Sequence, residues 1–231
     1  MKRFYDAVSI GAQGDGWQVM LDGRGVKTVR GADQRVPTQP LARALANEWD
    51  SQGETLNLAA FPLRGMADYA IDVVSQSRAQ VAAKLVAYAD TDTLLYRADP
   101  DEALYARQQA EWEPILTAFE ARLGITLKRV SGIIHAEQDA GALAQFGAAV
   151  EALEPFTLTG LEAMTTLAAS LSIGLSALEA DADAETLWRA ACLEEEWQAE
   201  QWGRDEEAEE RRARRTVDFL RAAEFARLAR L

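Results

Sequence analysis

The chain has 231 residues, and its 37 acidic side chains outnumber its 24 Lys and Arg side chains, which gives a formal net charge of −13. This acidity argues against nucleic-acid binding, because such binding depends on clustered Lys and Arg that neutralise phosphates. The only His and Cys residues are His135 and Cys192. A zinc site made of His and Cys, or a disulfide within one chain, is therefore excluded.

The composition favours a mostly helical globular protein. Apolar residues make up 48% of the chain, and Ala, the best helix former, makes up about a fifth of it. No run approaches the roughly 18 consecutive apolar residues of a membrane span. Asp6 stands where a signal peptide would begin its apolar region, and the single Cys fits a reducing compartment. We therefore expect a cytoplasmic protein with no membrane insertion.

The first stretch of the chain predicts a small antiparallel sheet that extends to about Val36. Short apolar runs, most of them alternating with polar residues, are separated by Gly-rich segments and by Asp22-Gly23. Asp-Gly between such runs is a strong hairpin signal, because both central turn residues need a positive φ. The Gly-x-Gly fragments at residues 14–16 and 23–25 match no phosphate-binding motif. They predict turns, and we expect no nucleotide or other cofactor.

A helix is predicted to follow the sheet. Thr38 can cap it, Pro40 suits its first turn, and Gly53 follows its end. Its apolar residues recur at intervals of four, at Leu41, Leu45 and Trp49. If this helix packs on the sheet, residues 1–60 form an N-terminal α+β domain. Residues 61–231 then form an all-α C-terminal domain.

The remainder of the chain has helical periodicity. A break is expected at 75–77 and a boundary at 99–100, and Pro114 should kink or restart the helix that Gly124 closes. Residues 125–134 are ambiguous and include a candidate extended stretch. Further helices are predicted over 140–153, over 158–178, and from 184 to the end with an interruption at Gly203.

The segment from Leu187 to Gly203 carries the most information about function. At 100° per residue, Glu195 lies near the centre of one helical face. The other residues on that face are Trp188, Ala191, Cys192, Ala199 and Trp202. Glu195 should therefore be partly buried and paired with an Arg, which is the favoured interpretation. The alternative is an acid that binds a partner beside an exposed Trp.

Charge is segregated near the C-terminus. Residues 194–210 hold nine acids and one Arg, whereas residues 211–230 hold seven Arg and two acids. This pattern is typical of a helix that turns back on an acidic neighbour, of a solvated tail, or of an interaction surface.

Residue types alone leave one catalytic alternative open. His135 is the only imidazole base, and no Gly-x-Ser-x-Gly nucleophile elbow accompanies it. Cys192 is interpreted as a small buried apolar residue within a predicted helix. Carboxylate pairs are plentiful, so a metal-independent hydrolase that uses such a pair or His135 remains the alternative function.

Taken together, the motifs resemble the ATP12 family, the assembly chaperones of the F1 sector of ATP synthase. The matching pieces occur in order along almost the whole chain: Lys2-Arg3-Phe4-Tyr5, Leu21-Asp22-Gly23-Arg24, Ala46-Asn47-Glu48-Trp49-Asp50, Phe61-Pro62-Leu63, Ala70-Ile71-Asp72, Thr91-Asp92-Thr93-Leu94-Leu95-Tyr96-Arg97, Trp112-Glu113-Pro114-Ile115-Leu116, and Leu193-Glu194-Glu195 through Trp202-Gly203.

The resemblance implies a chaperone, not an enzyme. It would bind the unassembled alpha subunit of F1-ATPase and prevent its aggregation until the beta subunit replaces it. Eukaryotic relatives carry a mitochondrial targeting segment, which is not expected in this chain, so it resembles a bacterial member. We also expect the chain to be monomeric when free. The candidate partner-binding residues are Glu194, Glu195, Trp202 and Gly203.

Overall fold

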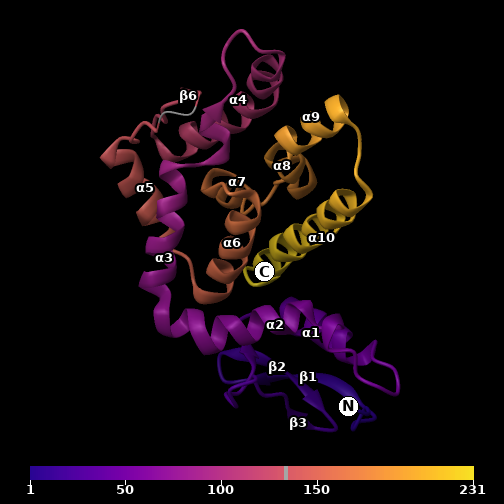
Figure 1. The fold of residues 1–231 in the computed structure, drawn as a ribbon. Coiled ribbons are helices and arrows are strands. Elements are labelled where there is room, and N and C mark those ends of the chain that lie inside the picture. Colours follow the sequence, from indigo (N-terminus) through magenta and orange to yellow (C-terminus); the bar gives the residue numbers. More distant parts are fainter. Residues whose placement is uncertain (133–134) are drawn as a thin grey trace. The chain divides into compact units, whose positions relative to one another are not determined.

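The computed structural model describes residues 1–132 and 135–231, and Figure 1 shows its helices and strands along the chain. The chain forms two compact units. The first comprises residues 1–78, 154–160 and 224–231, and the second comprises residues 79–153 and 161–223. The first unit thus takes in two segments from late in the sequence. The predicted boundary between folding domains after residue 60 stays a prediction.

The N-terminal sheet forms as predicted. Its strands are β1 (Val8–Gln13), β2 (Gly16–Leu21), β3 (Arg24–Gly25) and β4 (Arg35–Val36), and β2 pairs antiparallel with each of the others. Asp22 and Gly23 have φ values of 48° and 77° between β2 and β3. These are the positive values that a tight hairpin turn requires.

Helix α1 (Gln39–Asp50) packs against this sheet, also as predicted (Figure 1). The Thr38 hydroxyl caps the helix by accepting a hydrogen bond from Leu41 N at 3.2 Å. The Trp49 carbonyl accepts a hydrogen bond of 2.5 Å from the Tyr5 hydroxyl. The same core contains three residues from the end of the chain, which sequence reasoning missed: Phe225, Leu228 and Ala229.

The next helical region contains the predicted break. It consists of η1 (Leu58–Ala60), α2 (Pro62–Tyr69), the π-helical turn η2 (Ala70–Val74) and α3 (Ser75–Asp90). Ser77 lies inside α3 with non-helical φ and ψ values of −132° and 26°. The break expected at residues 75–77 is therefore confirmed.

The described residues of the second unit are helical apart from turns, loops and two very short strands. β5 (Tyr96–Arg97) pairs parallel with β6 (Val130–Ser131) after the 3-10 turn η3 (Thr93–Leu95). β6 confirms the candidate extended stretch in residues 125–134, of which 133 and 134 lie outside the described residues. The remaining helices of the chain are α4 (Ala103–Leu123), α5 (Ala140–Glu151), α6 (Pro155–Ala168), α7 (Leu171–Ser176), α8 (Ala184–Ala191), α9 (Leu193–Trp202) and α10 (Glu206–Leu228). The start of α6 and the end of α10 belong to the first unit. No helix among the described residues is long and apolar enough to cross a bilayer.

Helix α4 runs continuously through Pro114, and it ends where Gly124 adopts a φ of 66°. The helix therefore does not restart at the proline. Its buried side chains occur both before and after Pro114 in the sequence, since Trp112 and Leu116 are both fully buried. Trp112 Nε1 donates to the carbonyl of Ala190 at 2.8 Å, which ties α4 to α8.

The single helix predicted over 158–178 is wrong, because α6 and α7 are separated at Ala169, where φ is 48°. A new cap follows at once, since the Ser170 hydroxyl accepts from Ile173 N at 3.0 Å. The buried Asp92 carboxylate accepts from Ser172 N at 2.8 Å and from Leu94 N at 3.1 Å. Burial raises the pKa of Asp92 despite these hydrogen bonds.

Candidate functional site

The candidate site is built on α8, α9 and α10, where the sequence predicted one helix interrupted only at Gly203. The Asp183 carboxylate caps α8 by accepting from Glu185 N and Thr186 N, both at 3.1 Å. Cys192, with φ −93° and ψ 7°, ends α8, and α9 begins at the next residue. The expectation that Cys192 lies inside a helix is therefore wrong, although its side chain is buried as predicted.

The break at Cys192 also changes which side chains share one helical face. Trp188 on α8 is 3% exposed, whereas Trp202 on α9 is 80% exposed. Glu195 is exposed rather than partly buried, with 45% of its side chain accessible. A continuous helix would have kept these side chains on one face, whereas the break at Cys192 places Trp188 and Trp202 on separate helices. The predicted burial of Glu195 is therefore wrong.

The favoured ion pair of Glu195 with an Arg is confirmed. Arg215 Nη1 on α10 lies 2.6 Å from Glu195 Oε1. Glu196 binds Arg212 at 2.6 Å and also pairs with Arg204. These acids of α9 thus pair with Arg side chains of α10, whereas most of the later acids in residues 194–210 lie at the start of α10 itself. Each exposed pair stabilises the fold weakly, and together the pairs link α9 to α10.

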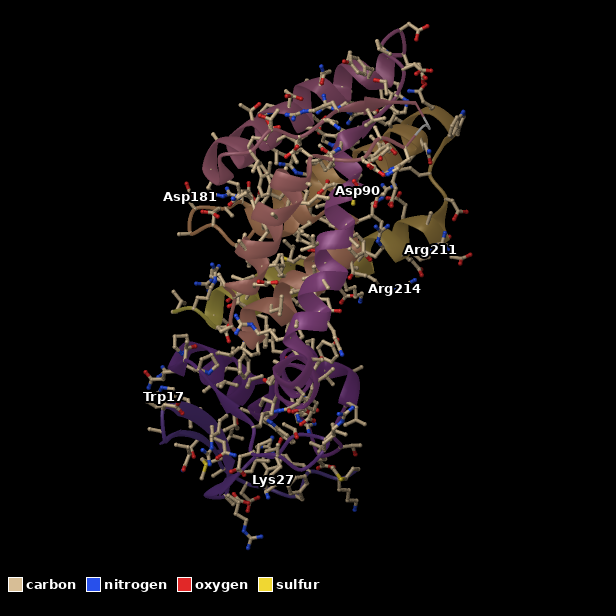
Figure 2. The ribbon with its side chains drawn as sticks, turned by 90° about the vertical axis from the view of Figure 1, so that its left-hand side faces the viewer. Trp17, Lys27, Asp90, Asp181, Arg211 and Arg214 are labelled. Atoms are coloured by element: carbon tan, nitrogen blue, oxygen red, sulfur yellow. The ribbon has the colours of Figure 1, made fainter. Side chains whose placement is uncertain are left out.

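Other Arg side chains of α10 do not reach α9. Arg211 and Arg214, labelled in Figure 2, pair with acids one turn earlier on their own helix. Their side chains are 55% and 63% exposed. They form a solvated face.

Glu194 is anchored in the opposite direction, towards α4. Its Oε1 accepts a 2.7 Å hydrogen bond from Gln108 Nε2. Gln108 is fully buried, and its side-chain oxygen accepts from Ala98 N at 2.9 Å. Burial raises the pKa of Glu194, and the hydrogen bond from Gln108 opposes this shift. Glu194 and Glu195 therefore hold α9 to different neighbours.

Trp202 and Gly203 form the end of α9. Gly203 has φ 96° and ψ 161°, a left-handed conformation that favours glycine. Its N–H donates to the Ala199 carbonyl at 3.0 Å and closes the last turn. Trp197, by contrast, is half-buried and lies under the guanidinium of Arg107, 5.8 Å from the ring centre. Trp202 is thus the aromatic side chain that α9 presents to solvent.

A groove of about 940 Å³ lies between α4, α8, α9 and α10, and sequence reasoning did not find it. Trp188 contributes to its floor, where it stacks on Phe219 with ring centres 4.9 Å apart. The other apolar lining residues are Pro114, Ile115, Ala190, Leu193 and Leu220. The charged lining residues are Arg107, Glu111, Glu185, Arg189, Glu196, Glu200 and Arg212. An apolar floor with charges of both signs suits a polypeptide segment with mixed side chains.

The environments of His135 and Cys192 bear on the catalytic alternative. His135 is half exposed, with Nδ1 2.9 Å from the Tyr96 hydroxyl and Nε2 3.2 Å from Asp90 Oδ2. Burial, together with the charge of Glu195, raises the pKa of the Cys192 thiol to about 11. A thiol that stays protonated at neutral pH is a poor nucleophile. Among residues 1–132 and 135–231, no group of His, Cys, Asp and Glu could hold a metal ion.

The comparisons with known proteins agree with the resemblance. The family model for the ATP12 chaperone protein matches residues 2–120. The chain is 25% identical over 221 residues to the mitochondrial protein atp12 of Schizosaccharomyces pombe, covering 90% of this chain and 76% of that protein. It is 38% identical to the crystal structure of Atp12 from Paracoccus denitrificans, with a TM-score of 0.95 over 99% of this chain and 98% of that one. The chain is also 34% identical to a protein of known crystal structure from Agrobacterium tumefaciens, with a TM-score of 0.91 over 99% of this chain and 85% of that one. The chain therefore belongs to the ATP12 chaperone family.

Proposed function

We propose that this chain binds the unassembled alpha subunit of F1-ATPase and prevents its aggregation until the beta subunit covers the same surface. Its family is a chaperone family and not an enzyme family, so the alternative of a metal-independent hydrolase is wrong. The observation that carries the proposal is the 80% exposed indole of Trp202, at the end of a helix held by ion pairs. Large aromatic side chains on a rigid support are the usual centres of protein interfaces.

The mechanism that we propose is mass action. Binding to an exposed apolar interface lowers the concentration of the aggregation-prone free subunit. The beta subunit displaces the chaperone because it buries more of that surface. This mechanism needs no nucleotide hydrolysis, so the chaperone acts through its surface alone.

In the proposed complex, α9 contributes the contact residues and its neighbours hold it in place. Glu194 and Glu195 fix α9 through Gln108 and Arg215. Trp202 then projects from a fixed base, and Gly203 permits the turn that follows. The groove beside α9 offers an apolar floor for client side chains, and its mixed charges set their register. We further propose that the free protein is a cytoplasmic monomer.

A co-purification experiment tests the proposal. The tagged chain is expressed with the alpha subunit alone, with the beta subunit alone, and with both. We expect capture of alpha but not of beta, and loss of captured alpha when beta is present. Capture of beta alone, or of neither subunit, would contradict the proposal.

A further inference from the structure

Among the residues that the structure describes, no strand pairs with the outer edge of β1. Within the sheet, β2 flanks β1 on one side, and the other side of β2 is covered by β3 and β4. Asp22 N donates to the Ala7 carbonyl at 3.0 Å, just before the first pair of the β1–β2 register, Val8 with Leu21. Hydrogen-bonded and non-bonded pairs alternate along an antiparallel ladder. Odd-numbered residues therefore bond to β2, and the backbone groups of the even-numbered residues point outwards: Val8, Ile10 and Ala12.

These outward N–H and C=O groups are free in the described part of the chain. No hydrogen bond from residues 1–132 or 135–231 engages them. The most extensive contacts of β1 are with β2, through the ladder, and with α1, which packs against the sheet. The edge is thus a row of paired donors and acceptors that matches the backbone of an extended peptide.

This edge lacks the features that usually prevent strand addition. Natural edge strands are blocked by Lys, by Pro, by bulges or by shortness. β1 has six residues, Val-Ser-Ile-Gly-Ala-Gln, with no charge, no proline and an unbroken register. Val8 and Ile10 pack against the core, which fixes the strand in place, while Ala12 is exposed. A preformed edge loses little conformational entropy when a strand adds to it.

We propose that the β1 edge binds an extended segment of the client subunit by strand addition. The proposal rests on the proposed function, because the client is the unassembled subunit. A second copy of this chain is disfavoured by the net charge of −13. Antiparallel pairing of two β1 strands about Ile10 would also place Asp6 of one copy opposite Gly14 of the other, beside Asp15 in the β1–β2 turn. An uncharged strand from another protein meets neither repulsion.

Amide hydrogen exchange with purified F1 alpha subunit tests the proposal residue by residue. The amides of Val8, Ile10 and Ala12 should become protected on binding. Those of Ser9 and Gly11, which already bond to β2, should change little. Protection of the even-numbered amides without client, in a chain that sediments as a dimer, would assign the edge to a second copy and overturn the proposal.

The substitution Ala12→Pro tests the same β1 edge by removing one of its backbone donors. It removes an outward N–H without breaking the ladder to β2, and edge strands tolerate such a proline. We expect about tenfold weaker binding of the alpha subunit, from one lost hydrogen bond and an unpaired client carbonyl. Ala12→Val keeps the N–H and should bind within about twofold of the unmodified chain. If Ala12→Pro unfolds the protein, the exchange pattern of the unmodified chain decides alone.

The outcomes separate this inference from the proposed function. If the unmodified chain binds the alpha subunit, but Ala12→Pro binds equally well and the even-numbered amides stay unprotected, only the edge proposal is overturned. If the unmodified chain does not bind the alpha subunit, both proposals are overturned.

Discussion

Replacing Trp202 with alanine separates the contribution of this side chain to binding from any contribution to folding. The indole is 80% exposed at the end of α9. Because so little of it is buried, its removal should change the free energy of unfolding by no more than about 0.5 kcal/mol. Any loss of client binding in this variant would therefore be a property of the surface.

The size of the expected loss follows from the exposed area. A Trp side chain can bury about 200 Å². With 80% of it still exposed, about 160 Å² remains for the client, which corresponds to an upper limit of about 4 kcal/mol. Immobilising the side chain costs about 1 kcal/mol. A loss of about 3 kcal/mol weakens the dissociation constant by about 100-fold.

The measurement is calorimetric titration of the alpha subunit with the variant, alongside thermal unfolding of the variant alone. Trp188→Ala is the matched control, because Trp188 is 3% exposed and stacks on Phe219. We expect that control to lose about 3–5 kcal/mol of stability. Unchanged affinity in Trp202→Ala would refute the assignment of Trp202 to the interface. Unfolding of Trp202→Ala would refute its assignment to the surface.

Three further predictions concern packing and ionisation. Gly174→Ala should destabilise the protein by about 1–3 kcal/mol, because a Cβ there would lie 2.5 Å from Thr165 Oγ1. Gly147→Ala, where a Cβ meets nothing within 4 Å, should stabilise it by about 0.5–1 kcal/mol, and denaturant titration compares the two. Cys192, with its pKa raised by burial to about 11, should resist a thiol reagent at pH 8 until the protein is unfolded. Burial opposes ionisation of Glu113, but hydrogen bonds from two Arg side chains lower its pKa overall. Its stabilisation is thus present above about pH 4.3 and lost as the pH falls through the lower folded-state pKa, and Glu113→Gln should flatten that part of a stability–pH curve.

The parts of the fold that depend on local chemistry were predictable from sequence. The Asp22-Gly23 turn forms because both residues adopt positive φ, and α1 begins where Thr38 can cap it. In each case the deciding interaction lies within a few residues of the signal. The sheet, its hairpin and the packed helix therefore follow from the pattern of residues.

The two missed helix breaks depend on contacts between distant residues. Nothing in the residue type of Ala169 predicts a left-handed φ of 48°. The helix that follows starts where Asp92, far earlier in the sequence, accepts a hydrogen bond from Ser172 N. Cys192 likewise ends α8 without a glycine or proline nearby. Helical periodicity continues across both positions, so sequence alone could not separate the helices.

The same limit explains the outcome for the candidate site. The ion pair of Glu195 was predicted because a carboxylate on a partly apolar helical face requires a charge partner, and the chain is rich in Arg. The exposure of Glu195 was not predictable, since the face that it was expected to share with Trp188 and Trp202 exists only in an unbroken helix. The groove was also missed, because α4 contributes to it from a distant part of the sequence.

We propose above all that this chain keeps the alpha subunit of F1-ATPase from aggregating. The most direct measurement is light scattering by purified alpha subunit diluted from denaturant, with and without equimolar chaperone. We predict that the chain suppresses the scattering, and that later addition of beta subunit releases alpha into an alpha–beta complex. Unchanged aggregation of alpha at excess chaperone would contradict the claim.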